Sequence, residues 1–196
     1  MSYIIVGLGN PTSEYENTRH NTGRILVTWF GKSLDAEWKF DGKAKATTAK
    51  VKVSKTPVIL VLPDTFMNKS GNSIKQLGGS SSKWAEKMIV IYDDLDLPFG
   101  KAKISFNKSS GGHKGLESII KAIKTEKFAR IRVGISPTTA TGKIRKPSSE
   151  SAVTKLILGK FKPDELIQLK KISKKVNEAL ETSVTSGLQK AMTEFN

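Results

Sequence analysis

Four short segments of the chain hold polar side chains at places where a binding site could form: three come just after an apolar run, and the fourth follows a predicted edge strand and begins a helix. They span residues 7–21, 62–71, 92–98 and 109–115. The chain has two histidines, His20 and His113, and both lie in these segments. Because the unperturbed pKa of histidine is about 6.5, its side chain is the one best suited to accept a proton near neutral pH. The segments therefore predict a site in which a histidine acts as a general base.

A carboxylate that accepts a hydrogen bond from the other ring nitrogen would fix the histidine tautomer and stabilise the imidazolium. Asp93 is the best candidate for this role because it directly follows a run that reads as a buried strand. Asp94 and Asp96 compete for the same role, and the sequence alone does not choose among the three. Turn formation and Mg²⁺ binding are the other interpretations of this acidic segment.

The chain carries a large positive charge that is unevenly placed. It has 33 Lys and Arg against 18 Asp and Glu, a formal net charge of +15. Residues 121–175 hold fifteen of the basic residues and four acidic ones, a surplus of eleven. Such a field favours a polyanionic partner, and nucleic acid is the leading candidate. A basic surface that serves only solubility is the alternative, and the few aromatic residues argue against a stacking-based binder of single strands.

Carboxamide side chains in the polar segments supply neutral hydrogen-bond donors and acceptors for an ester or amide group. They belong to Asn10, Asn21 and Asn68. Together with a histidine–aspartate pair and a basic surface, they favour hydrolysis of an ester on a nucleic acid, with water as the nucleophile.

Several other classes of site are excluded by what the sequence lacks. It has no cysteine, which rules out disulfides, cysteine-ligated metals and thiol catalysis. Gly7 and Gly9 are followed by Thr12 where a dinucleotide-binding loop has its third glycine. The nucleophile elbow and the phosphate-binding loop are absent, and the two histidines lack metal-ligand spacing. These patterns therefore give no support for a zinc site or a nucleotide cofactor, and we expect no cofactor.

The pattern of apolar residues predicts strands that alternate with helices, which is typical of an α/β domain with a largely parallel or mixed sheet. Strands are expected at residues 3–7, 44–53 (exposed), 58–62 (central), 88–92, 101–106 (edge) and 131–135. Helices are expected after a cap at Asn21 or Thr22, over residues 67–77 and 115–123, and after Pro163. Residues 138–149 are interpreted as a mobile basic loop.

No apolar run reaches the roughly 18 residues that a membrane span requires. The chain opens directly into an apolar, strand-like run at Tyr3, without the pattern of a signal peptide. We therefore expect a soluble, cytoplasmic protein without a membrane partner.

Several ordered motifs resemble those of the bacterial-type peptidyl-tRNA hydrolase family, and the resemblance covers nearly the whole chain. The motifs are Val6-Gly7-Leu8-Gly9-Asn10-Pro11, Thr18-Arg19-His20-Asn21, Phe66-Met67-Asn68-Lys69-Ser70-Gly71, Asp93-Asp94-Leu95-Asp96-Leu97-Pro98-Phe99-Gly100, Gly111-Gly112-His113 and Arg130-Ile131-Arg132-Val133-Gly134-Ile135. The resemblance implies one α/β domain over residues 1–196, with a twisted mixed β-sheet flanked by helices. It also implies a metal-free monomer that cleaves the ester between a peptide and the 3′ ribose of tRNA, recycling tRNA from aborted translation.

The resemblance further implies roles for individual residues. His20 would be the general base that activates water, and Asp93 would hold its basic form. Asn10 would complete the catalytic set by distinguishing peptidyl-tRNA from free aminoacyl-tRNA, and with Asn68 it would bind the peptide main chain. Contacts with substrate or tRNA are implied for Tyr15, Phe66, Met67, Lys114, Lys103 and Arg132.

The chain departs from the family pattern at a few positions. Lys114 stands where the family usually has an asparagine that helps to place the water. Lysine keeps a donor, loses the acceptor and adds a charge, so we expect a slower enzyme or one that uses Lys114 electrostatically. Thr12 replaces a usual glycine, and Arg24 replaces a usual aromatic residue. The alternative to an enzyme is a non-catalytic RNA-binding paralogue of the same fold.

Overall fold

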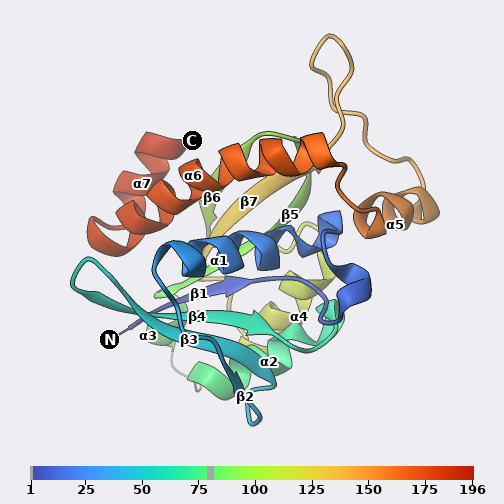
Figure 1. Ribbon diagram of the computed structural model, residues 1–196. Coiled ribbons are helices and arrows are strands. Elements are labelled where there is room, and N and C mark those ends of the chain that lie inside the picture. Colours follow the sequence, from blue (N-terminus) through green and yellow to red (C-terminus); the bar gives the residue numbers. More distant parts are fainter. Residues whose placement is uncertain (1, 79–81) are drawn as a thin grey trace.

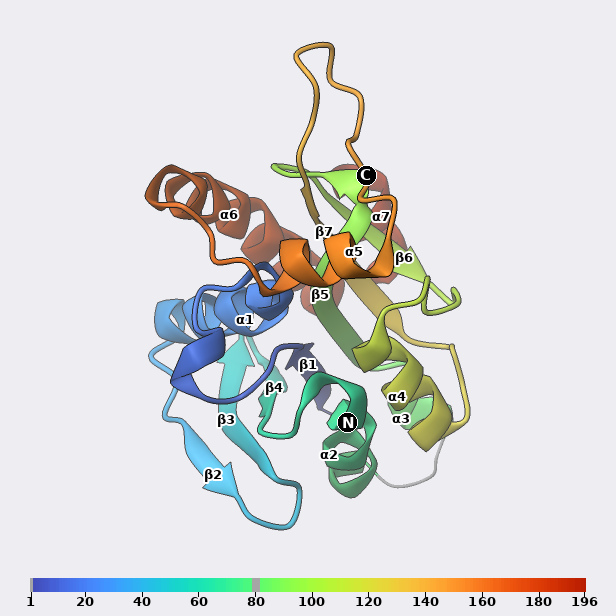
Figure 2. The same cartoon turned by 90° about the vertical axis from the view of Figure 1, so that its right-hand side faces the viewer.

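The structure is a computed structural model that describes residues 2–78 and 82–196. Within them, seven strands form one mixed sheet in the order β2-β3-β4-β1-β5-β7-β6 (Figures 1 and 2). The strands are β1 (Tyr3–Gly7), β2 (Lys39–Asp41), β3 (Ala46–Val53), β4 (Thr56–Pro63), β5 (Met88–Pro98), β6 (Ala102–Phe106) and β7 (Ala129–Ser136). Strands β4, β1, β5 and β7 run parallel, whereas β3 and β6 pair antiparallel with their neighbours. The predicted α/β fold with a mixed sheet is confirmed.

The continuous apolar runs of the sequence form the parallel centre of the sheet, because these strands are covered on both faces. Two predictions about the outer strands have different outcomes. The edge strand expected near residue 101 is β6, whereas β3 is wrongly expected to be exposed: it lies between β2 and β4, and its Ala46 and Ala49 are buried. The sequence pattern does not indicate β2, because this strand has only three residues and exposes Lys39 and Phe40.

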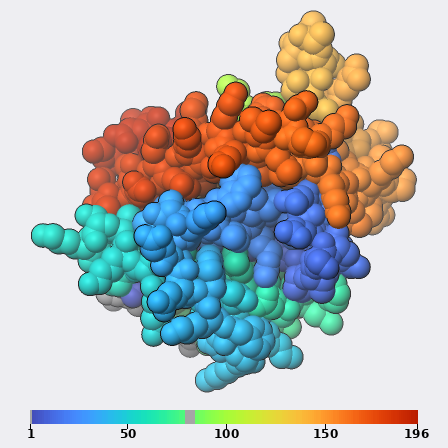
Figure 3. All heavy atoms as spheres, viewed as in Figure 1, coloured from blue at the N-terminus to red at the C-terminus, as the bar shows by residue number. Residues whose placement is uncertain are grey.

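Helices cover both faces of the sheet (Figure 2). One face carries α1 (Thr22–Ser33), α6 (Pro163–Thr185) and α7 (Leu188–Phe195), and the other carries α2 (Ser70–Gly78), α3 (Ser82–Ala85) and α4 (Lys114–Ile123). Figure 3 shows α6 (orange) lying alongside α1 (blue) on the outer surface. The remaining helix, α5 (Glu150–Leu158), packs against η2 (Arg19–Asn21), a 3₁₀ turn just before α1. The basic loop between β7 and α5 projects from the molecule (Figure 1).

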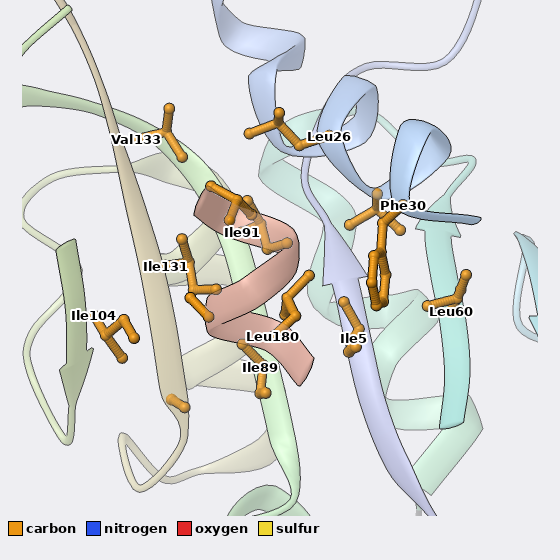
Figure 4. Close-up of a cluster of buried hydrophobic side chains, with 14 of the residues drawn as sticks. Ile5, Leu26, Phe30, Leu60, Ile89, Ile91, Ile104, Ile131, Val133 and Leu180 are labelled. Carbon is orange, nitrogen blue, oxygen red and sulfur yellow. The ribbon is translucent and has the colours of Figure 1, made fainter. Parts of the chain in front are cut away.

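Packing between the sheet and the α1/α6 layer fixes α1 in place (Figure 4). Leu26 and Phe30 from α1 and Leu180 from α6 meet Ile5 of β1 and Ile91 of β5, and all five are fully buried. Burying one such side chain stabilises a fold by roughly 1.5–3 kcal/mol. The start of α1, and with it η2, is therefore anchored to β1 and β5.

Two glycines let the first turn of α1 approach the sheet closely. A Cβ on Gly23 would collide with the carbonyl oxygen of Ile91, and one on Gly7 would stand 2.5 Å from the carbonyl oxygen of Gly23. The backbone is correspondingly tight, since the Arg24 N–H donates to the Leu8 carbonyl at 2.9 Å. This close approach brings η2 to the carboxyl ends of β1 and β5.

We expect Gly23→Ala to lower the free energy of unfolding by about 2–3 kcal/mol, because the added methyl group overlaps the Ile91 carbonyl oxygen. Gly42→Ala is the control, since a Cβ there would have only the Phe40 side chain within 4 Å, at 3.8 Å. Urea denaturation measures both variants. A Gly23→Ala protein as stable as the wild type would contradict this packing.

Candidate active site

A cleft of about 460 Å³ opens beyond the carboxyl ends of β1 and β4, the edge at which open α/β sheets bind ligands. Its lining residues are Asn10, His20, Phe66, Met67, Asn68, Lys69, Lys114, Thr154, Ile157 and Leu158. Three of the four polar segments of the sequence meet in this cleft. The remaining segment, residues 92–98, contributes Asp93, which contacts the His20 ring on its Nδ1 side.

Asp93 on β5 accepts a hydrogen bond from the His20 ring. The His20 Nδ1 lies 2.9 and 3.0 Å from the two Asp93 carboxylate oxygens, and the Asp93 side chain is 2% exposed. Because an ionised carboxylate can only accept, Nδ1 carries the hydrogen and Nε2 carries the lone pair. His20 also lines the cleft, so Nε2 is the basic atom that it offers to a ligand.

His113 contacts Asp93 from another direction and also caps α4. Its Nδ1 accepts the backbone N–H groups of Gly115 and Leu116 at 3.2 and 3.3 Å, so the ring hydrogen sits on Nε2. That Nε2–H donates to Asp93 Oδ1 over 3.0 Å. The sequence leaves the role of His113 open, and the structure places it as a second donor to the carboxylate, with a tautomer set by the backbone.

Burial and charge act in opposite directions on the His20–Asp93 pair. Burial alone lowers the pKa of His20, but the charge of Asp93 and its hydrogen bond outweigh burial, so the pKa is raised above 6.5. Burial alone raises the pKa of Asp93, but the charge of His20 and the hydrogen bonds from both histidines hold it well below its usual range. Asp93 therefore stays ionised over the range in which His20 titrates.

The two neighbouring aspartates have other partners. Asp94 Oδ2 accepts a hydrogen bond from Arg132 Nε at 2.7 Å, and its Oδ1 accepts the Asp96 N–H at 2.7 Å beside an irregularity in β5. The Asp96 carboxylate contacts the Lys146 ammonium on the basic loop. Among the aspartates left open by the sequence, Asp93 is thus the one that contacts His20.

Asn10 and Asn21 are locked together at the end of β1. The Asn10 N–H donates to Asn21 Oδ1 at 2.8 Å, and Asn21 Nδ2 donates to the Asn10 carbonyl at 3.0 Å. Of the two predicted caps, Asn21 holds the N-cap position and Thr22 is the first residue of α1. The Asn21 side chain makes no capping hydrogen bond, because its amide is engaged with Asn10. Asn10 Oδ1 accepts the Met67 N–H at 2.8 Å, so Nδ2 is the donor that Asn10 offers to the cleft.

Phe66, Met67, Asn68 and Lys114, for which the family resemblance implies contacts with substrate, all line the cleft. Phe66, Met67 and Asn68 come from the turn after β4, and the rings of Phe66 and Tyr15 meet edge to face with centroids 6.5 Å apart. Lys114 begins α4, and its side chain is 69% exposed.

Lys103 and Arg132 do not line this cleft. They are directly paired across β6 and β7. The hydrogen bond from Arg132 to Asp94 raises the pKa of the guanidinium, which stays charged. Lys103 lines a groove of about 870 Å³ between β6 and α6. The predicted site residues therefore form two groups: one in and beside the cleft around His20, and one basic pair, Lys103 and Arg132, on adjacent strands.

Sequence reasoning misses one wall of the cleft, which α5 provides through Thr154, Ile157 and Leu158. This helix has no buried residue and follows a loop rich in threonine, serine and lysine. Two signals could have indicated it: the helical spacing of Val153, Leu156 and Ile157, and Ser149, a helix-capping residue directly before Glu150.

The ligand atoms of His20, Asp93 and His113 all lie within 4.8 Å of one another, a spacing that could hold a metal ion. The hydrogen-bond pattern argues against this use, because both ring nitrogens that face Asp93 carry hydrogens rather than lone pairs. A metal ion on His113 Nε2 would also force a hydrogen onto Nδ1 and break the cap of α4. The cluster fits a hydrogen-bonded His–Asp–His arrangement better than a metal centre.

Known proteins match both the sequence and the fold. The family model described as peptidyl-tRNA hydrolase matches residues 4–196. The chain belongs to this family. The peptidyl-tRNA hydrolase of Aquifex aeolicus is 38% identical over 189 residues, which cover 96% of this chain and 93% of that protein. The peptidyl-tRNA hydrolase of Bdellovibrio bacteriovorus is 36% identical over 99% of both chains.

A solved structure extends the match to three dimensions. The crystal structure of peptidyl-tRNA hydrolase from Acinetobacter baumannii aligns with a TM-score of 0.85 at 29% identity, over 100% of this chain and 94% of that one. The family resemblance and the fold expected from the motifs are confirmed. Among the helices that the structure describes, none combines the length and the apolar character needed to cross a bilayer.

Proposed function

We propose that this chain hydrolyses the ester between the peptide and the 3′ ribose of tRNA in peptidyl-tRNA, with His20 as the general base. The orientation of His20 carries this proposal: Asp93 accepts the Nδ1 hydrogen at 2.9 Å, which leaves the basic Nε2 to the cleft. Membership of the family supplies the substrate class. Turnover of an N-acetylated aminoacyl-tRNA, with free aminoacyl-tRNA as the control, tests the proposal.

In the reaction, His20 Nε2 takes a proton from water as the water oxygen attacks the ester carbonyl carbon. Asp93 stays ionised and stabilises the imidazolium that forms. When the tetrahedral intermediate collapses, the bond to the ribose 3′ oxygen breaks, and the imidazolium returns its proton to that oxygen. The products are a peptide with a free carboxyl group and a tRNA with a free 3′ hydroxyl.

Asn10 and Asn68 bind the peptide main chain beside the ester. The backbone and Oδ1 of Asn10 are held by Asn21 and Met67, so its Nδ2 donor is pre-organised and loses little entropy on binding. A peptide carbonyl next to the ester accepts from such a donor. Free aminoacyl-tRNA has a charged amino group in place of that amide and makes no such contact, which accounts for the discrimination.

The tRNA is bound at two places. The ring of Phe66, which lines the cleft, and the ring of Tyr15 against it offer aromatic surfaces to the 3′ end of the tRNA. Lys103 and Arg132, paired across β6 and β7, contact phosphates and orient the tRNA without reading its sequence.

The pH dependence of kcat/KM should report the neutral form of His20. Since Asp93 raises the pKa of His20 above 6.5, activity should fall as the pH is lowered through an apparent pKa above that value. In Asp93→Asn the charge is lost and burial remains, so the limb of any residual activity should move to lower pH. An acidic limb of the wild-type kcat/KM profile with an apparent pKa below 6.5 would contradict this effect of Asp93 on His20.

Lys114→Asn should raise kcat by roughly fivefold. The Lys114 ammonium lies 3.2 Å from Glu117 on the exposed side of α4, and a lysine offers the attacking water no acceptor. The asparagine supplies one, and a hydrogen bond of this kind contributes about 1 kcal/mol. Lys121→Asn, an exposed lysine on the same helix, is the control and should leave kcat unchanged. An unchanged or lower kcat in Lys114→Asn would show that the lysine is no handicap.

A further inference from the structure

Arg19, the residue before the proposed base, contacts a segment distant in the sequence through both its backbone and its side chain. Its Nη1 donates to the carbonyls of Gly159 at 3.2 Å and Lys160 at 3.0 Å. Its Nη2 lies 2.7 and 2.8 Å from the two carboxylate oxygens of Glu165. The Arg19 backbone N–H also donates to the Gly159 carbonyl at 3.0 Å, and the guanidinium covers the Phe161 ring at 5.2 Å.

These partners belong to the segment that joins α5 to α6. Glu165 also accepts the Lys162 N–H at 2.7 Å, a capping contact that begins α6. The backbones of the two segments pair directly, since Thr18 forms an antiparallel bridge with Lys160 and the Phe161 N–H donates to Asn17 at 2.8 Å. The end of α5 is therefore tied to the turn that carries His20.

The position of α5 depends on this tie. The helix has no fully buried residue, and only its half-buried Ile157 packs against the main hydrophobic core, so hydrophobic packing alone holds it weakly. Its last turn nevertheless places Ile157 and Leu158 in the wall of the cleft, opposite the segment with Phe66. Leu158 is 41% exposed and Phe66 is 52% exposed, so the cleft offers apolar surface that a substrate would cover.

We propose that Arg19 is a positioning residue that holds α5 as the apolar wall of the cleft, and that this wall binds an apolar group next to the ester. This role rests on the proposed function. The wall contacts parts of the substrate that do not react, so it contributes uniform binding and acts on KM rather than on proton transfer. The apolar group is either the side chain of the amino acid at the ester or the terminal base of the tRNA.

Arg19→Gln should raise KM by roughly tenfold while kcat changes by no more than about twofold. The apparent pKa of the acidic limb, which reports His20, should stay where it is in the wild type. Arg19→Lys keeps the charge but not the forked geometry and should recover part of the loss. Lys190→Gln is the matched control, because it breaks an exposed ion pair with Glu194 on α7, and it should change neither constant. Thermal unfolding of each variant shows that the comparison is made between folded proteins.

A double-mutant cycle tests whether Arg19 acts through α5. Leu158→Ser should raise KM by itself, and adding Arg19→Gln should raise it little further, because both changes remove the same wall. Fully additive effects would overturn the inference. Comparing N-acetyl-glycyl-tRNA with N-acetyl-leucyl-tRNA identifies the bound group: a KM difference that disappears in Arg19→Gln assigns the wall to the amino-acid side chain, and an unchanged difference assigns it to the terminal base.

Hydrogen exchange separates this inference from the proposed function, because it needs no turnover. Amides of α5 should exchange faster in Arg19→Gln than in the wild type, whereas amides of β1 and β5 should not change. A wild type without turnover would contradict the proposed function alone. Unchanged exchange in α5, or a loss of kcat with a shifted pH limb and an unchanged KM, would overturn the role of Arg19.

Discussion

Asp93→Asn should lower kcat by about 10³- to 10⁴-fold while the protein stays folded and still binds tRNA. The substitution is nearly isosteric, so packing around the buried side chain is preserved. Its effect comes from hydrogen-bond polarity. A carboxylate accepts on both oxygens, whereas an amide accepts on one atom and donates from the other.

The surroundings of Asp93 dictate which way the new amide would point. His113 is committed as a donor, because its Nδ1 already accepts two backbone N–H groups and its Nε2–H lies 3.0 Å from Asp93 Oδ1. The amide oxygen must therefore face His113. The amide nitrogen then takes the place of Oδ2, 2.9 Å from His20 Nδ1. The amide oxygen stays 3.0 Å from the same atom but is shared with the His113 donor, so the shorter contact at Nδ1 is now with an N–H.

A donor at this position favours the other tautomer of His20, because a hydrogen on Nδ1 would face the amide N–H. The ring hydrogen then moves to Nε2, and the atom that should remove a proton from water already carries one. The variant therefore keeps its histidine in place but in the form that cannot act as a base. Asp96→Asn makes the same chemical change three residues along the chain and should retain activity, since the Asp96 carboxylate contacts only Lys146 among the described residues.

Nitrogen-15 NMR of the two histidine rings measures the tautomers directly. In the wild type, His20 should carry its hydrogen on Nδ1 and His113 on Nε2, and Asp93→Asn should change His20 alone. An Asp93→Asn protein with kcat near the wild-type value, or with the tautomer of His20 unchanged, would contradict this part of the account.

The central strands can be predicted from the sequence because their runs of apolar residues have a direct physical cause. Strands covered by helices on both faces need apolar residues at every position, as in β1 and β4. Polar residues at the carboxyl ends of such strands then indicate a site, and His20 and Asn10 were found in this way. The family motifs added roles that patterning does not carry.

The choice among Asp93, Asp94 and Asp96 depended on information that the sequence does not hold. All three follow the same apolar run, and only the register of β5 against its neighbours decides which side chain faces η2. Asn21 illustrates the same limit, since local preference made it a helix cap and a contact with Asn10 overrode that preference.

The α5 wall was missed for a different reason. The helical spacing of Val153, Leu156 and Ile157 indicates a helix but not where it lies, because the end of α5 is tied to the site by Arg19 and Glu165. Its place in the site depends on a contact between residues 146 positions apart in the chain, and local sequence patterns do not report such contacts.

Removing the His20 side chain should have the other large effect. A positioned general base contributes about 10²- to 10⁴-fold to the rate. In His20→Ala the other histidine that contacts Asp93 is His113, and it cannot replace His20 because its Nδ1 caps α4 and its Nε2–H donates to Asp93. Binding of tRNA should be little changed, because Lys103 and Arg132 lie outside the cleft.

The most direct test is hydrolysis of an N-acetylated aminoacyl-tRNA by the wild type and by His20→Ala, with free aminoacyl-tRNA as the discrimination control. We expect turnover by the wild type, a loss of at least about 100-fold in His20→Ala with tRNA binding retained, and no hydrolysis of the free aminoacyl ester by either protein. Tight tRNA binding without turnover that depends on His20 would contradict it, and would show instead an RNA-binding member of the fold that has kept the cleft without the reaction.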